Sequence, residues 1–136
     1  MRNAQSTLLY KWFNEVWNND DESAISRLMT ENSFALGVIA EDAPQGPEGF
    51  KTFFNQFRSQ FHGVNISVDD VISQDDMEAA RTTVAAIHTD TGKPVSFSGM
   101  CMVKIEDGKI AHAWNNFDFL NLYQQLGQQL TPSTPK

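Results

Sequence analysis

Residues 95–118 read VSFSGMCMVKIEDGKIAHAWNNFD, and this stretch decides the fold class. The dipeptide Asp107-Gly108 is typical of a two-residue type I′ turn. On both sides of it apolar and polar residues alternate, which is typical of β-strands. The spacing therefore predicts a β-hairpin with two long antiparallel strands, over residues 95–106 and 109–118.

The turn also predicts which residues of the two strands share a face. If the turn places Glu106 opposite Lys109, stepping back along both strands pairs their residues in a fixed order. One face then carries a mixture of aromatic and polar residues suited to the wall of a ligand pocket: Phe97, His112, Trp114, Asn116 and Asp118. A β-bulge anywhere in the hairpin would move the residues beyond it to the other face.

The opposite face of the hairpin is expected to lie on the outside of the sheet. It carries Met100, Met102, Ala113 and Phe117, an apolar surface that a monomer would rarely leave in contact with water. We therefore expect a homodimer formed through the outer face of the sheet.

Upstream of the hairpin, the spacing of apolar residues predicts helices first and strands afterwards. The expected helices span residues 6–18, 23–29 and 48–61, the expected strands 33–40, 64–68 and 79–88, and a short helix follows the hairpin over residues 119–126. This order predicts an α+β fold in which helices cover one face of a curved antiparallel sheet. We expect a single domain over residues 1–127 and a flexible C-terminal tail over residues 128–136.

Composition narrows the classes of partner. The formal net charge is −7 and the basic residues are dispersed, which argues against a nucleic-acid partner. No apolar run is long enough to cross a membrane, and the N-terminus shows no secretory signal, so we expect a cytoplasmic protein. One cysteine and three scattered histidines form no zinc pattern, so no metal is expected.

Asp118 is the main candidate for chemistry, and it has two interpretations. In an apolar pocket its carboxylate would have a raised pKa and could transfer protons, whereas as an N-cap it would begin a helix at Phe119. His112 could assist proton transfer, although a lone histidine is more often structural. Trp12 and Trp17 lie on opposite flanks of the first helix, so one could line the pocket while the other covers its rim.

Several motifs resemble the SnoaL-like (polyketide or ester cyclase) family of the NTF2-like superfamily. They include Ile105-Glu106-Asp107-Gly108-Lys109-Ile110 and, above all, Trp114-Asn115-Asn116-Phe117-Asp118 followed by Gln125-Leu126-Gly127. The resemblance covers about residues 5–127 and implies a cone-shaped α+β barrel, NTF2-like or cystatin-like, with N-terminal helices on the concave face of its sheet. True cyclases of this family close a ring by an intramolecular aldol condensation without metal or organic cofactor. An acidic residue on their last strand acts as the general acid/base. The motif match assigns that role to Asp118.

Two hypotheses about function follow. The first is an enzyme without cofactor, a cyclase, isomerase or lyase acting on a mostly apolar carbonyl compound, with Asp118 and His112 as its catalytic residues. Its substrate-binding residues would be Trp12, Trp17, Phe97, Trp114 and Asn116. The second is a non-catalytic NTF2-like module that binds a small molecule or dimerises. The two hypotheses differ in whether Asp118 lies in a pocket or caps a helix.

Overall fold

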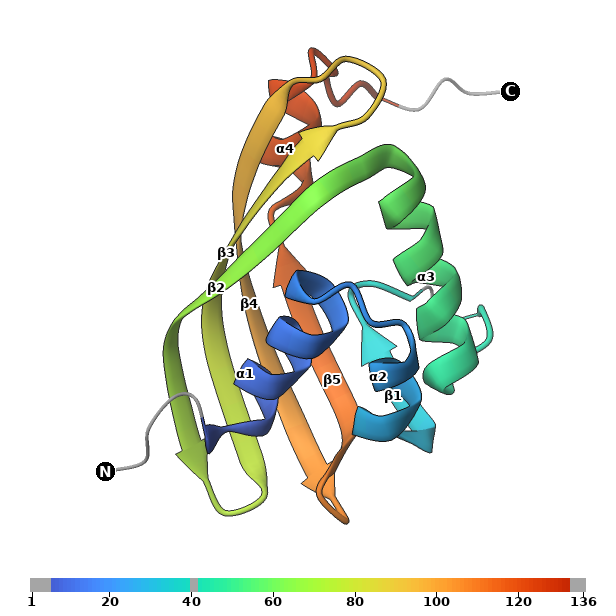
Figure 1. Cartoon of the computed structure of the whole chain (residues 1–136), viewed down its shortest axis with the longest axis vertical. Coiled ribbons are helices and arrows are strands. Elements are labelled where there is room, and N and C mark those ends of the chain that lie inside the picture. Colours follow the sequence, from blue (N-terminus) through green and yellow to red (C-terminus); the bar gives the residue numbers. More distant parts are fainter. Residues whose placement is uncertain (1–5, 40–41, 133–136) are drawn as a thin grey trace.

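The computed structural model describes residues 6–39 and 42–132, and it has the predicted α+β fold (Figure 1). The helices are α1 (Leu8–Trp12), α2 (Ser23–Leu28), α3 (Gly46–Gln60) and α4 (Phe119–Gln125), and the π-helix η2 (Phe13–Asn18) continues α1. The strands are β1 (Met29–Leu36), β2 (Phe61–Gln74), β3 (Met77–His88), β4 (Pro94–Glu106) and β5 (Lys109–Phe117). The predicted hairpin turn at Asp107-Gly108 is confirmed, because Glu106 pairs with Lys109.

The five strands form one curved, unclosed sheet in the order β1-β5-β4-β3-β2. Figure 1 shows α1, α2 and α3 lying across one face of this sheet, while α4 packs at the end of β4. The sheet is antiparallel, as predicted, except at one edge, where β1 runs parallel to β5. Two parallel strands need a long connection between them. Here α3 and the strands β2, β3 and β4 lie between β1 and β5 in the chain and provide it.

The first helix changes type halfway along its length. Residues 13–18 form a π-helix, whose wider turn ends at Asn18. The Asn18 amide Nδ2 donates a hydrogen bond to the Ile66 carbonyl at 2.9 Å, and its Oδ1 accepts from the Ile66 N–H at 2.6 Å. This pair of bonds fastens the end of the helix to β2. The wider turn also brings Trp12 and Trp17, five residues apart, to the same side of the helix.

The start of α1 is fastened to β3 by a buried carboxylate. Glu78 is only 3% exposed, and its two carboxylate oxygens accept hydrogen bonds from the backbone N–H groups of Leu8 at 3.1 Å and Leu9 at 2.8 Å. The first N–H groups of a helix have no partner within the helix, and a negative charge is favoured there. Glu78 therefore positions α1 over the sheet without leaving its own charge unpaired.

Helix α3 supplies much of the hydrophobic core. Phe50 and Phe54 are buried, and the Phe61 side chain that follows the helix is also buried. Phe53 and Phe57, on the same helix, are only half-buried and pack against this core. The apolar face of α3 therefore contributes to the core through Phe54 and to the pocket wall through Phe50, Phe53 and Phe57.

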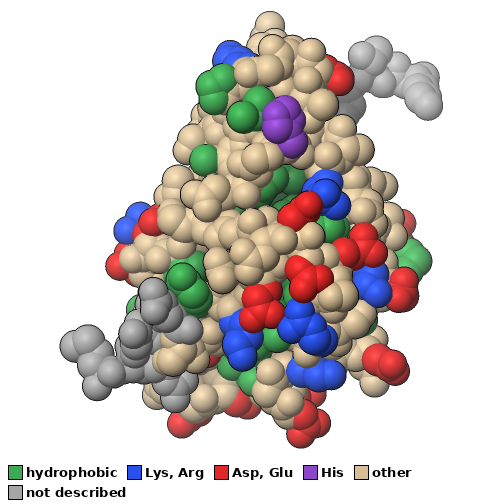
Figure 2. All heavy atoms as spheres, in the orientation of Figure 1, with side chains coloured by type: hydrophobic (Ala, Val, Ile, Leu, Met, Phe, Trp, Pro, Cys, Tyr) green, Lys and Arg blue, Asp and Glu red, His purple; other side chains and the backbone are tan. Residues whose placement is uncertain are grey.

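The helical face of the molecule is charged but locally neutralised. Figure 2 shows basic side chains beside acidic ones on this face. Arg27 pairs with Glu15 and Asp21 at 2.9 Å each, and Arg58 pairs with Asp20 at 2.6 Å. These exposed pairs link α2, α3, η2 and the loop between η2 and α2 on the solvent side of the helices.

Two predicted boundaries fall partly outside the described part of the chain. The strand expected at residues 33–40 begins earlier, at Met29, and residue 40 is not among the described residues. Residues 128–132 of the predicted tail are exposed and have no regular secondary structure, and residues 133–136 lie outside the described ranges. Over the described residues, no helix is both long enough and apolar enough to span a membrane.

Candidate active site and ligand pocket

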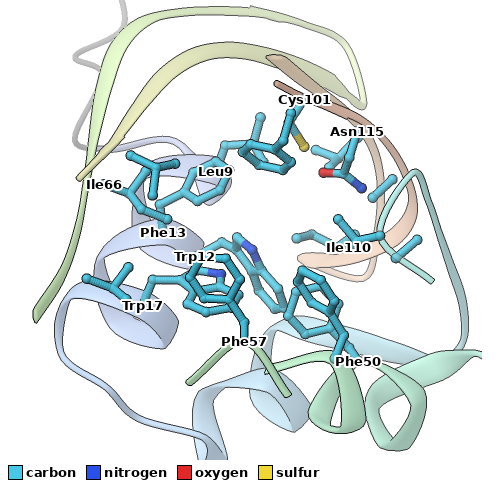
Figure 3. A pocket seen from close by; sticks show the side chains of 18 of the residues that line it. Leu9, Trp12, Phe13, Trp17, Phe50, Phe57, Ile66, Cys101, Ile110 and Asn115 are labelled. Carbon is cyan, nitrogen blue, oxygen red and sulfur yellow. The ribbon is translucent and has the colours of Figure 1, made fainter. Parts of the chain in front are cut away.

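A pocket lies between the helices and the concave face of the sheet (Figure 3). Its helical wall is aromatic: Trp12, Phe13, Trp17, Phe50, Phe53 and Phe57. Its sheet wall is mostly aliphatic, with side chains that include Ile66, Val84, Phe97, Cys101, Val103, Ile110, Ala113, Asn115 and Phe117. The cavity volume open to the centre of a water molecule is about 50 Å³, several times what one water needs. A larger ligand would have to displace half-buried side chains such as Phe53 and Phe57.

A β-bulge in the hairpin decides which side chains reach this pocket. Ile105 pairs with Ile110, but the next pair is Lys104 with His112, so Ala111 is an extra residue in β5. Beyond this point each β5 residue is shifted by one position relative to the register expected from the turn. The one-residue shift moves every β5 side chain beyond the bulge to the opposite face.

The side chains predicted to face the pocket are consequently correct for β4 and wrong for β5 beyond the bulge. Phe97 lines the pocket, whereas His112, Trp114 and Asn116 do not. Their side chains lie on the convex, outer face of the sheet, where Trp114 pairs with the exposed Met102. Trp114 is 40% exposed and half-buried His112 stacks between Trp114 and Phe34, with ring centroids 5.6 and 5.2 Å apart.

Asp118 lies at the end of β5 and does not line the pocket. Its Oδ1 accepts a hydrogen bond from the Asn121 N–H at 3.0 Å, which makes Asp118 the N-cap of α4. The residue is exposed, and its own N–H donates to the Ser98 carbonyl at 2.9 Å. Of the two interpretations of Asp118 drawn from the sequence, the structure therefore agrees with the helix cap.

The structure brings three of the predicted site residues together in this pocket, namely Trp12, Trp17 and Phe97. Two others, Asn116 and Asp118, line a separate hollow together with Arg81 and Ser98. The two tryptophans both line the pocket, instead of one lining it and the other covering the rim. Trp17 packs edge-on against Phe50 and Phe57, with centroids 6.2 and 5.6 Å apart. The helical wall is therefore a connected set of aromatic rings.

Beyond the bulge, sequence reasoning missed three pocket residues on β5: Ala113, Asn115 and Phe117. Gly99, a glycine in the interior of a predicted strand, was the sequence signal that could have drawn attention to them. A Cβ atom at Gly99 would lie 2.2 Å from Cδ1 of Phe117, so the ring occupies space that only glycine leaves free. A glycine that accommodates a cross-strand aromatic ring fixes which residues lie opposite each other, independently of the turn.

The pocket wall carries almost no group that could transfer a proton near neutral pH. Among the described residues that line it, Cys101 is the only one with a titratable side chain, and burial raises the pKa of its thiol to about 12. The thiol is therefore neutral at physiological pH. Asn115 is the one lining side chain in this described set that carries an amide. The wall can bind an apolar molecule but offers it no general base.

Comparisons with known proteins place the chain in a structural context. A family model described as SnoaL-like polyketide cyclase matches residues 7–126. A proposed polyketide cyclase from Bacillus cereus is 28% identical with a TM-score of 0.74, over 90% of this chain and 78% of that one. TsrD from Streptomyces laurentii is 22% identical with a TM-score of 0.80, over 93% of this chain and 98% of the other.

The fold itself recurs at lower sequence identity. A Catenulispora acidiphila protein with a ketosteroid isomerase-like fold is 11% identical, with a TM-score of 0.77 over 93% of this chain and 98% of that one. No functionally curated protein matches the sequence. These likenesses agree with the helix-covered curved sheet described above.

The cap role of Asp118 predicts a specific pattern of stability. Asp118→Ala removes the acceptor for the Asn121 N–H and should lower the free energy of unfolding by about 1 kcal/mol, measured by urea denaturation. Asp118→Asn keeps an acceptor and should change it by less than about 0.5 kcal/mol. Asp90→Ala, at another exposed carboxylate, is the control and should be nearly neutral. Equal losses in both Asp118 variants would contradict the cap.

Proposed function

Because this chain belongs to the SnoaL-like polyketide cyclase family, we propose that its pocket binds a small, uncharged, mostly apolar molecule. One observation carries the proposal: the pocket is walled by aromatic and aliphatic side chains, and its described lining includes neither carboxylate nor cation. Ligand sites are mostly apolar with a few placed polar groups, and burying an unpaired charge is costly. A carbonyl compound of the kind that the family cyclises fits this description.

The aromatic helical wall favours a flat ligand. Trp12 and Trp17 each contact Phe50, with ring centroids 4.9 and 6.2 Å apart, so their positions are mutually restrained. Such rings offer a large contact area at little entropic cost because they are already packed. Trp12, Trp17 and Phe97 are therefore proposed as the residues that contact the body of the ligand.

Binding can be tested with N-phenyl-1-naphthylamine, an uncharged dye that fluoresces in apolar surroundings. We expect the wild-type protein to enhance and blue-shift the emission. Ala113→Phe should weaken the affinity at least about tenfold, because the new ring fills space beside Val103 and Asn115.

The matched control for this test is Trp114→Ala, one residue along β5 and on the outer face. Its affinity should stay within about twofold of the wild-type value. The reverse pattern, in which Trp114→Ala abolishes binding and Ala113→Phe does not, would place the dye on the outer face and contradict the proposal.

Family membership favours a second candidate, an intramolecular aldol cyclase. In that reaction a carbon loses a proton and forms a bond to a carbonyl carbon of the same molecule, while the carbonyl oxygen gains a proton. The pocket would contribute chiefly by folding the substrate so that the two carbons meet. Under this candidate Asp118 transfers the proton from the end of β5, which requires the substrate to extend beyond the pocket. His112 lies on the outer face of the sheet, so it could assist only a substrate bound there.

A linear poly-β-ketoester tests the second candidate, with ring closure and the loss of water that follows it detected by the absorbance of the conjugated product. If Asp118 transfers the proton, Asp118→Asn lowers turnover roughly 100-fold while substrate binding changes little. Because Asn retains the helix cap, a loss of turnover could not be attributed to unfolding of α4. Turnover equal to that of wild type would remove Asp118 from the mechanism.

The outer face of the sheet supports association with a second copy. The bulge changes which residues lie on this outer face. Ala113 and Phe117 face the pocket, whereas Trp114 lies outside with Met100 and Met102. Phe34 and Ile72 extend this surface across β1 and β2, with exposures of 44% and 73%. A contiguous exposed apolar surface of this kind is typical of an interface, so we propose a homodimer formed through it.

Light scattering at micromolar concentration should report twice the mass of one chain. Met102→Lys, at the centre of this surface, should shift the protein to monomers because it would bury an unpaired charge in the interface. The control is Lys109→Glu, next to the turn at the end of the hairpin and away from this surface, and it should leave the mass of the dimer unchanged. A wild-type protein that is monomeric at this concentration would exclude the proposed dimer.

A further inference from the structure

We propose that Asn115 orients the bound molecule by accepting a hydrogen bond from it, so that the pocket selects a neutral aromatic or conjugated compound with a hydroxyl group at one end. This inference rests on the proposed binding function and adds to it the direction of the polar contact. It is carried by the geometry of one amide at the sheet wall of the pocket.

The orientation of the Asn115 amide is determined by its neighbour on β1. Its Nδ2 donates a hydrogen bond to the Leu36 carbonyl at 3.0 Å. Only the nitrogen can face that carbonyl, because a flipped amide would set two acceptor oxygens against each other. The oxygen Oδ1 must therefore point the other way, and Figure 3 shows it directed toward the cavity.

The backbone next to this contact prevents the amide from moving aside. Gly37, directly after β1, has φ of +91°, and a Cβ atom there would lie 2.0 Å from the Asn115 backbone oxygen. Only glycine allows the chain to approach β5 so closely. The close approach holds Leu36 beside Asn115, so Oδ1 is fixed in place before any ligand arrives.

Asn115 Oδ1 accepts no hydrogen bond from the described part of the chain, although its Nδ2 is paired. An amide oxygen accepts hydrogen bonds and cannot donate them. It is complementary to a ligand O–H or N–H, and it offers nothing to a carbonyl oxygen or a carboxylate. An acceptor left unpaired when a ligand removes water from it costs free energy, so ligands without a donor are disfavoured.

The remainder of the pocket limits the rest of the ligand. Cys101, the cross-strand partner of Asn115, has a neutral thiol because burial raises its pKa to about 12. The opposite wall includes the rings of Trp12, Trp17 and Phe57. A charged ligand would find no counter-ion among the described lining residues, whereas a flat phenol or enol would present its ring to the tryptophans and its hydroxyl to Asn115.

Two small probes separate a donor from an acceptor: 4-fluorophenol, which has a hydroxyl donor, and 4-fluorobenzaldehyde, which has only an acceptor. Their dissociation constants can be measured by ¹⁹F NMR titration of the wild-type protein. We expect the phenol to bind about 5- to 10-fold more tightly, the usual worth of one hydrogen bond in a buried site. Equal affinities, or tighter binding of the aldehyde, would overturn the inference.

Asn115→Leu should bring the two affinities to within about twofold of each other, because it removes the acceptor while keeping a similar volume. The matched control is Asn116→Leu, the same chemical change one residue along the strand on the outer face, and it should preserve the wild-type ratio. If Asn115→Leu does not fold because the Leu36 carbonyl loses its donor, the comparison of the two probes on wild type still decides the matter.

Failure of this inference is distinguishable from failure of the proposed function. If both probes bind equally and Ala113→Phe removes both, the pocket binds ligands but Asn115 does not select a donor. If neither probe nor the naphthylamine dye binds to wild type, both the proposed function and this inference are wrong.

Discussion

One extra residue in the last strand, Ala111, controls the character of the pocket. Because β5 alternates between two faces, the bulge exchanges the side chains that face the helices for those that face away. Without it His112, Trp114 and Asn116 would face the helices. With it the pocket receives Ala113 and Asn115 instead, so a polar, titratable wall becomes an apolar wall with a single amide.

Neighbouring contacts hold this register in place. The ring of Phe117 lies over Gly99, and a Cβ atom at Gly99 would collide with it. On the other side of β5, Gly37 approaches the Asn115 backbone closely. Sliding β5 by one residue would lose both fits and bury His112 without a partner, which is costly. The bulged register is therefore supported from both of the strands that flank β5.

The separation of the carboxylates from the pocket has a chemical consequence. Glu78 is buried but is paired with the first N–H groups of α1, and Asp118 begins α4. Each carboxylate has a structural role where it stands, and neither belongs to the pocket lining. Membership of a cyclase family thus coexists here with a pocket whose described lining carries no carboxylate. Fold and family alone do not determine which chemistry a particular pocket performs.

The sequence by itself determined the order of helices and strands, the Asp107-Gly108 turn and the family. These features depend on short-range patterns, namely apolar spacing, turn-forming dipeptides and the Trp114–Asp118 motif, which a linear chain displays directly. The tertiary structure decided the parallel pairing of β1 with β5, the π-helical turn that brings Trp12 and Trp17 together, and the bulge at Ala111. Each of these depends on contacts between residues distant in sequence, such as Gly37 with Asn115 and Asn18 with Ile66, and no local pattern specifies such contacts.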